Sequence, residues 1–366
     1  MRPYPHLLLM LALSFVLLDI SVSDSGPISH PTIRFSVKEI FPKIKEWFKA
    51  SGIGQVFKTL WADLTRQQAP ITRGTKLDGL GKIKVFLDLL GYVNPVLGLI
   101  DDVFDVAFEL AVKSYQTTYS LNSTGALDFD TLQHMSYPRC GVADIVNNKT
   151  TINTVDPNHW WIEGKTEFTY GFLPNTSMLN GIADDDIRAL IKDAFSKWSN
   201  ITMLNFTESK YNVSDIVIVF TELDGKGAVV GGSDGNSTVH FGYFYVDKEE
   251  QWVLPGENKT EEAIDLESVV IHQIGHLLGL EHSTAEDSVM YPSILPSNES
   301  KLNFADNDIE RIQKLYPRPS SPPSPAPAPA SQGHSSPTTA SGGVGLGCRG
   351  LVTVLSIGFA FVVLFY

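Results

Sequence analysis

The stretch "SVVIHQIGHLLGLEHS" (residues 268–283) carries three histidines around one glycine. His272 and His276 are four positions apart, so on a helix they lie on the same face, one turn from each other. Gly279 can end that helix with a positive φ, which other residues resist, and the reversed chain then brings His282 back. Three neutral imidazoles with an open fourth position are typical of a catalytic zinc site. The spacing therefore predicts zinc ligands at His272, His276 and His282.

The rest of the chain divides into two blocks with different apolar patterns. Residues 35–136 place apolar side chains at the helical period, which predicts a mainly helical block. Residues 158–317 alternate between strand and helix patterns, which predicts an α/β (α+β) fold. Strand patterns occupy residues 166–172, 215–220 and 238–246, and helical patterns occupy residues 184–199, 261–280 and 307–316.

Two further motifs lead to a family resemblance. The histidine segment resembles the metzincin signature H-E-x-x-H-x-x-G-x-x-H, and "SVMYP", which contains Met290, resembles the Met-turn that follows it. "PRCGVAD" (138–144) resembles the cysteine switch of matrix metalloproteinases, usually P-R-C-G-V-P-D, with Ala143 in place of a proline. The resemblance covers residues from about 45 to 317 and is closest to the plant branch. It implies a mixed sheet with three helices in residues 145–317, preceded by a helical prodomain in residues 24–144.

The resemblance also implies roles for single residues. The Cys140 thiolate would fill the open zinc position until the prodomain is removed, since a thiolate is a good zinc ligand. Arg139 and Asp144 would form the ion pair that shapes the switch loop, and Met290 would form an apolar floor beneath the zinc ligands. The alternative for Cys140 is an idle buried thiol.

Gln273 is the main departure from the family pattern. Active members have a glutamate here, which accepts a proton from the attacking water and passes it to the leaving amine. A glutamine amide has nearly the same shape but cannot take up that proton, and loss of general-base catalysis is worth about 10²–10⁴-fold in rate. Glu281 is a candidate replacement, although it lies beyond the helix. Two hypotheses follow: a slow or specialised metalloendopeptidase of the extracellular matrix, or a pseudoprotease that binds peptides or partner proteins without cutting them.

The other departures concern further metals. Family members hold a second, structural zinc, but Gly232 and Tyr245 stand where two of its histidines are expected, so the sequence predicts one zinc per chain. Asp224, Asp247 and Glu250 match a calcium site of the family, and hard oxygen ligands suit calcium. A solvated acidic surface is the alternative for these three residues.

Both ends of the chain resemble processing signals. Residues 1–23 have a basic start, an apolar run and small residues suited to cleavage, which predicts a secretory signal peptide. Residues 318–343 are Pro/Ser-rich and predict an extended stalk. Residues 344–366 follow a cluster of small residues and end in an apolar tail, which predicts a glycolipid (GPI) anchor signal with its attachment site near Ser341. A tail-anchored helix is the alternative.

The expected location and partners of the protein follow from these signals and from its net charge. We expect the protein on the outer face of the plasma membrane or in the extracellular matrix, with extracellular or cell-wall proteins or peptides as partners. The formal net charge of −13 argues against nucleic acid as a partner, because no net positive field would attract a polyanion. N-x-[ST] sequons predict glycosylation at Asn122, Asn148, Asn175, Asn200, Asn205, Asn212, Asn236, Asn258 and Asn298.

Overall fold

The computed structural model describes residues 53–67, 69–93, 101–156, 164–174, 178–236, 240–257, 260, 263–294 and 301–317. The predicted signal peptide, stalk and anchor signal lie outside these residues. Among the helices described, none combines the length and the apolar character needed to cross a membrane.

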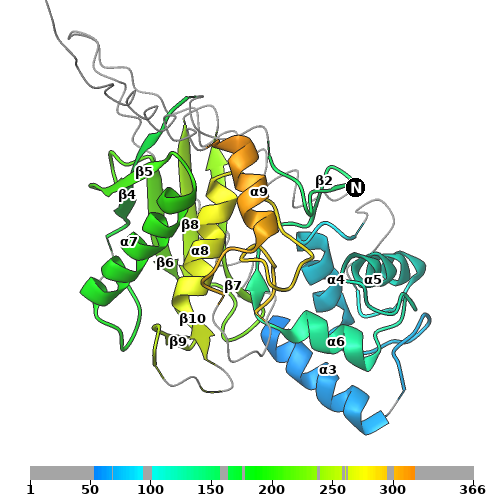
Figure 1. Ribbon diagram of the computed structural model, residues 1–366. Coiled ribbons are helices and arrows are strands. Elements are labelled where there is room, and N and C mark those ends of the chain that lie inside the picture. Colours follow the sequence, from blue (N-terminus) through cyan, green and yellow to red (C-terminus); the bar gives the residue numbers. More distant parts are fainter. Residues whose placement is uncertain are drawn as a thin grey trace, which may run out of the picture. The chain divides into compact units, whose positions relative to one another are not determined.

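The N-terminal block contains four described helices, α3 (Ile53–Gln67), α4 (Leu80–Leu89), α5 (Val106–Thr118) and α6 (Phe129–Ser136) (Figure 1). Asp105 and Asp128 begin the last two helices, because their carboxylates accept hydrogen bonds from the Phe108 and Thr131 amides at 2.8 and 2.9 Å. The four helices bury a shared apolar core that includes Phe57, Phe86, Phe108 and Leu132. The helical prodomain predicted from the sequence is confirmed.

A mixed sheet forms the centre of the C-terminal block. Its order is β1-β7-β8-β6-β4-β5, and every neighbouring pair is parallel except β7 with β8. The bounds are β1 (Arg139–Cys140), β4 (Glu167–Phe172), β5 (Asn205–Glu208), β6 (Ile216–Thr221), β7 (Val229–Asn236) and β8 (Phe241–Asp247). Two small ladders stand apart from it, β2 (Ile145–Val146) with β3 (Lys149–Thr150), and β9 (Trp252–Val253) with β10 (Ile264–Asp265).

Both faces of this sheet are apolar, which explains why β6 is an almost unbroken apolar run. Ile216, Ile218 and Phe220 face the main core, whereas Val217 and Val219 face a second cluster on the opposite side. Such a run gives no alternation from which the buried face could be predicted.

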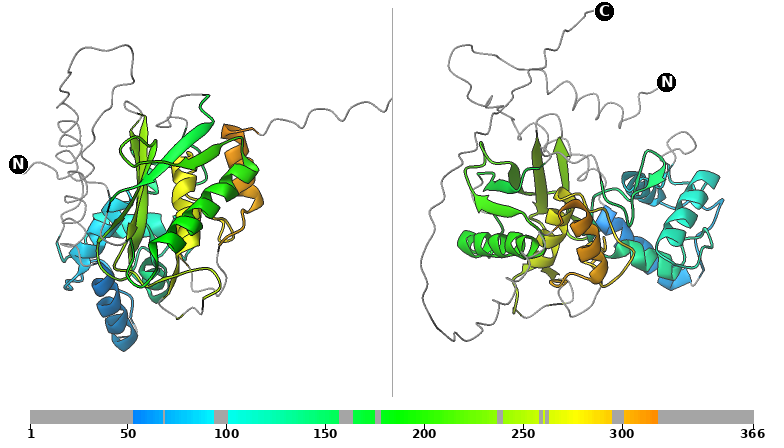
Figure 2. Two further views of the ribbon diagram at one scale, coloured as in Figure 1. Left: turned by 90° about the vertical axis from the view of Figure 1, so that its left-hand side faces the viewer. Right: turned by 45° about the horizontal axis from the view of Figure 1, so that its top comes forward.

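Three helices complete the block: α7 (Asp184–Ile201), α8 (Leu266–Leu277) and α9 (Asp306–Leu315). Figure 2 shows α7 and α8 against one face of the sheet, where Trp198 and Ile271 are buried together in the main core. Three acids in the first turn of α7 suit the positive end of the helix dipole. The predicted α/β fold with a mixed sheet and three helices is confirmed.

One predicted boundary is wrong. The helical pattern at 261–280 predicted a helix that begins several residues too early, because Ile264 and Asp265 form strand β10 beside β9. Asp265 then caps α8, since its carboxylate accepts a hydrogen bond from the Ser268 amide at 2.8 Å. The tertiary pairing with β9 outweighs the helical preference of the preceding residues.

Candidate metal centre

Helix α8 presents His272 and His276 on one face, and backbone carbonyls orient both rings. The Nδ1 atom of His272 lies 2.8 Å from the Val289 carbonyl oxygen, and that of His276 lies 2.8 Å from the Leu280 carbonyl oxygen. A carbonyl oxygen can only accept, so each Nδ1 carries the proton. The Nε2 atom of each ring is therefore left with a lone pair, which is the form that ligates a metal.

His282 reaches the same point from beyond the helix. Gly279 has φ of 92° and its amide donates to the His276 carbonyl at 2.9 Å, which closes the helix and turns the chain back. The His282 Nδ1 atom donates to Asp144 Oδ1 at 2.7 Å. Its Nε2 atom is buried without a hydrogen-bond partner among the described residues. This third nitrogen is therefore also a free lone pair.

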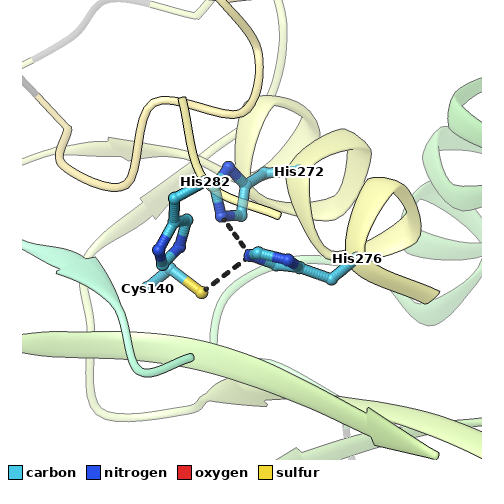
Figure 3. A group of neighbouring side chains, drawn as sticks. All are labelled: Cys140, His272, His276 and His282. Atoms are coloured by element: carbon cyan, nitrogen blue, oxygen red, sulfur yellow. Dashed lines mark hydrogen bonds between the residues drawn. The ribbon is translucent and has the colours of Figure 1, made fainter. Parts of the chain in front are cut away.

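The three Nε2 atoms and the Cys140 Sγ atom converge within 4.8 Å of one another (Figure 3). The Nε2 atoms of His272 and His276 are 3.0 Å apart, and Cys140 Sγ lies 3.6 Å from the second of them. Burial, followed by the neighbouring imidazoles, lowers the pKa of His272 and His276 well below the usual value, so both rings stay neutral. Lone pairs that face one another in a buried space need a cation, and an N₃S donor set suits zinc.

Cys140 is brought to the cluster by a strand of the prodomain segment. On one edge of β1 the Gly141 amide donates to the Gly231 carbonyl of β7 at 2.9 Å. On its other edge the Cys140 amide donates to the Pro292 carbonyl at 2.8 Å. The switch segment (residues 138–144) therefore lies between β7 and the chain after Met290. It covers the edge of β7, which would otherwise be open.

Arg139 and Asp144 form a buried ion pair at 2.9 Å, with side chains 1% and 0% exposed. The remaining oxygen of Asp144 accepts hydrogen bonds from the hydroxyls of Tyr92 and Tyr119 at 2.9 and 2.8 Å. Burial alone would raise the pKa of Asp144, but Arg139 and the hydrogen bond from His282 outweigh burial and hold it well below the usual range. The sequence contained no signal for the two tyrosines, whose role depends on prodomain packing.

Met290 is fully buried beneath helix α8. A side chain at Gly275 would place its Cβ 2.3 Å from Met290 Sδ, so the glycine is what allows this close approach. Asp308 holds the turn, because its carboxylate accepts hydrogen bonds from Ser288 Oγ and the Val289 amide at 2.5 and 3.0 Å. Sequence reasoning missed Asp308, although an acid in the first turn of α9 was visible.

Gln273 lies between the two helical histidines and is fully buried. Its Nε2 atom donates to Cys140 Sγ at 3.3 Å, and its Oε1 atom has no hydrogen-bond partner among the described residues. The amide therefore faces the same space as the metal ligands. In that position it can donate a hydrogen bond, but it cannot accept a proton.

Among the three acids predicted to bind calcium, some carboxylate oxygens accept hydrogen bonds from backbone amides and others have no partner among the described residues. Glu250 Oε1 accepts from the Gly227 amide at 2.7 Å, while Asp224 Oδ1 and Asp247 Oδ2 are buried without a partner in the described part of the chain. Burial raises the pKa of Asp224, Asp247 and Glu250 to about 8, 7 and 8, and repulsion from Asp247 adds to this for the other two. Free carboxylate oxygens are the ligands that calcium prefers, and calcium binding by these three residues stays a prediction.

Gly232 and Tyr245 are direct cross-strand partners of β7 and β8. A Cβ atom built on Gly232 would lie 2.4 Å from the Tyr245 hydroxyl oxygen, so the phenol occupies the space that a side chain at 232 would need. Position 232 therefore has no room for a side chain beside Tyr245, and the expectation of one zinc per chain stays a prediction.

Five sequon asparagines are exposed in the structure: Asn122, Asn148, Asn200, Asn205 and Asn212. Asn236 lies in β7, but its side chain is outside the described part, as are the sequons at residues 175, 258 and 298.

Comparison with known proteins gives the family. The family model described as Matrixin matches residues 160–317, and the model described as a putative peptidoglycan binding domain matches residues 78–135. Metalloendoproteinase 1 of Glycine max is 37% identical over 264 residues, which cover 66% of this chain and 83% of that protein. The chain belongs to the matrixin family.

Other matrixins are similar over comparable stretches. Metalloendoproteinase 2-MMP of Arabidopsis thaliana is 35% identical over 277 residues, 66% of this chain and 72% of its own length. Matrix metalloproteinase-18 of Xenopus laevis is 33% identical over 223 residues, 59% of this chain and 45% of its own length. This matrixin is therefore a zinc protein of the matrix metalloproteinase type, and its similarity to plant members confirms the predicted resemblance.

Proposed function

We propose that this matrixin binds one zinc ion through His272, His276 and His282 and that its proteolytic activity is absent or strongly reduced. The observation that carries the proposal is Gln273, whose fully buried amide occupies the general-base position beside three correctly oriented imidazoles. The ligand set supports metal binding, whereas the amide removes the proton acceptor.

When bound, zinc supplies a Lewis acid that polarises a peptide carbonyl. The chain's own contribution is orientation, since the three Nδ1 hydrogen bonds hold the rings in the ligating tautomer. Gln273 can orient a water or a carbonyl by hydrogen bonding, but it cannot remove a proton. The expected loss is about 10²–10⁴-fold in rate.

Glu281 does not replace the missing base. Burial, followed by the charge of Asp156, raises the pKa of Glu281 to about 7, which would suit a base. However, its carboxylate is hydrogen-bonded to Thr151, and its own amide donates to the Thr154 carbonyl at 3.3 Å. The Thr151 contact places the Glu281 carboxylate against the loop after β3.

Peptide binding is the function that remains open to such a site. We propose extracellular matrix or cell-wall proteins or peptides as the partners. In the structure the switch segment occupies the edge of β7 along which an extended peptide would otherwise pair. A pseudoprotease that binds peptides or partner proteins is the alternative to a slow matrix-degrading enzyme, and Gln273 favours it.

The remaining sequence predictions belong to the same proposal. We propose an extracellular protein held at the plasma membrane by a GPI anchor near Ser341 and glycosylated on its exposed sequons. A calcium ion at Asp224, Asp247 and Glu250 is supported by their burial and free oxygens. It would neutralise carboxylates that repel one another.

The test compares peptide hydrolysis by zinc-loaded residues 145–317 with hydrolysis by the Gln273→Glu form. If only the base is missing, the variant hydrolyses peptides about 10²–10⁴-fold faster, or about 3–5 kcal/mol in barrier. Glu281→Gln in the natural background is the matched control, and it should change nothing. Robust hydrolysis by the natural form, lost in Glu281→Gln, would contradict the proposal, because Glu281 would then be the base. A zinc-loaded Gln273→Glu form that stays inactive would mean that the missing base is not the only defect, because substrate binding or the support that Asp144 gives to His282 has also been lost.

A further inference from the structure

We propose that Gln273 converts the Cys140–histidine set into a closed structural zinc site, in which the prodomain is a permanent part of the protein and not a removable inhibitor. The inference rests on the proposed zinc site and concerns what the fourth ligand does there. It assigns Gln273 a positive role, as a positioning residue for the sulfur ligand.

The first step is the contact between Gln273 and Cys140. The Cys140 sulfur accepts a hydrogen bond from Gln273 Nε2 at 3.3 Å and one from the Val142 amide at 3.4 Å. Donors of this kind stabilise negative charge on a sulfur ligand and fix its position. An ionised carboxylate at position 273 has no hydrogen to donate and would bring a second negative charge against the sulfur. The amide therefore replaces a repulsive contact by an attractive one.

The second step is burial. Cys140 is 2% exposed and Gln273 is fully buried, so the hydrogen bond lies away from bulk water. Withdrawal of Cys140 would break the hydrogen bond from Gln273 Nε2, the one that the structure gives this side chain. The amide thus adds a cost to opening that a site with a carboxylate does not have.

The prodomain side also supports one of the three histidine ligands. Asp144, which belongs to the switch segment, receives the Nδ1 proton of His282 at 2.7 Å and is itself held by Arg139 at 2.9 Å. A carboxylate behind a ligating histidine orients the ring and increases its basicity. Removal of the prodomain would therefore remove one ligand and also the support of another.

One side chain of the catalytic domain also packs in the apolar core of the prodomain. Tyr291, next to Met290, is 5% exposed and packs within the apolar cluster of the prodomain helices. Its hydroxyl oxygen lies 2.9 Å from His134 Nε2. The two parts are thus joined by the Asp144–His282 contact and also by the Tyr291–His134 contact. Four protein ligands with no open position are the hallmark of a structural zinc site, for which a general base is not needed.

The experiment measures how often Cys140 leaves the site in the full zinc-loaded chain. The thiol is alkylated with iodoacetamide at neutral pH, and modification of the Cys140 peptide is followed by mass spectrometry, with Cys348 counted separately. The natural chain is compared with Gln273→Glu and with Gln273→Met, which has a similar length but neither donor nor charge. We expect alkylation in the natural chain to be about 10–100-fold slower than in Gln273→Glu, the worth of one hydrogen bond to a charged group, with Gln273→Met between them.

Zinc content measured on the same samples separates the possible failures. Equal alkylation rates in chains that each hold zinc would show that Gln273 does not keep Cys140 in place. The closed structural site would then be refuted, while the proposed zinc site would remain. Absence of zinc from the natural chain would overturn both. If Gln273→Glu does not fold, the comparison with Gln273→Met decides, and a natural chain that reacts as fast as the Met form refutes the inference.

Discussion

His134 should make the contact between prodomain and catalytic domain sensitive to acid. Its ring lies between two tyrosine hydroxyls, with Nδ1 2.7 Å from Tyr115 and Nε2 2.9 Å from Tyr291. Burial, followed by the nearby charge of Arg139, lowers its pKa from 6.5 to about 4, while Asp144 opposes the shift. The folded protein therefore holds this imidazole neutral, whereas the unfolded chain protonates it near its ordinary pKa.

The direction and the size of the stability change follow from the thermodynamic linkage between proton binding and folding. Because the folded pKa lies below the unfolded one, the contribution of His134 to stability is complete above pH 6.5 and is lost as the pH falls toward 4. Between pH 7 and pH 4.5 the loss is about 2 kcal/mol, at 1.36 kcal/mol per pKa unit. For a chain of this size, that corresponds to roughly 4–8 °C in the midpoint of thermal unfolding.

The assay is thermal unfolding of the natural chain and of His134→Gln at both pH values. The glutamine can keep a hydrogen bond to a tyrosine but does not titrate, so the variant should lose about 2 kcal/mol less on acidification. Using the difference between the two proteins cancels the titration of Asp144 and of the calcium-site acids. If both proteins lose the same stability between pH 7 and pH 4.5, the reasoning about His134 is refuted.

Three further predictions concern metal, packing and anchoring. Metal analysis should find one zinc per chain, lost in His272→Ala; two tightly held zinc ions would contradict the interpretation of Gly232 and Tyr245. Gly275→Ala should destabilise the protein by about 1–3 kcal/mol in denaturant unfolding, because its Cβ would lie 2.3 Å from Met290 Sδ; an unchanged midpoint would show that the Met-turn can move aside. A phosphatidylinositol-specific lipase should release the protein from membranes, and retention after chemical deamination as well would favour a spanning tail.

The sequence alone determined those features that depend on local geometry. His272, His276 and Gly279 are related by the helical period and by one turn with positive φ, so their spacing predicts how they will lie. The switch motif and the Met-turn are likewise short runs of consecutive residues. The lack of a proton acceptor at Gln273 is a property of the side chain itself, and no fold can supply one.

The tertiary structure decided everything that joins distant segments. Asp144 and His282 are 138 positions apart, and only the packing of the switch segment against the catalytic domain brings the carboxylate to the imidazole. The same packing places Gln273 against Cys140 and Tyr291 within the prodomain core, and the pairing of β7 with β8 sets Tyr245 over Gly232. Such contacts depend on which surfaces fold together, and no period or spacing within one segment encodes them. That is why the sequence shows Gln273 as a missing base, whereas the fold also shows it as a donor to the sulfur ligand.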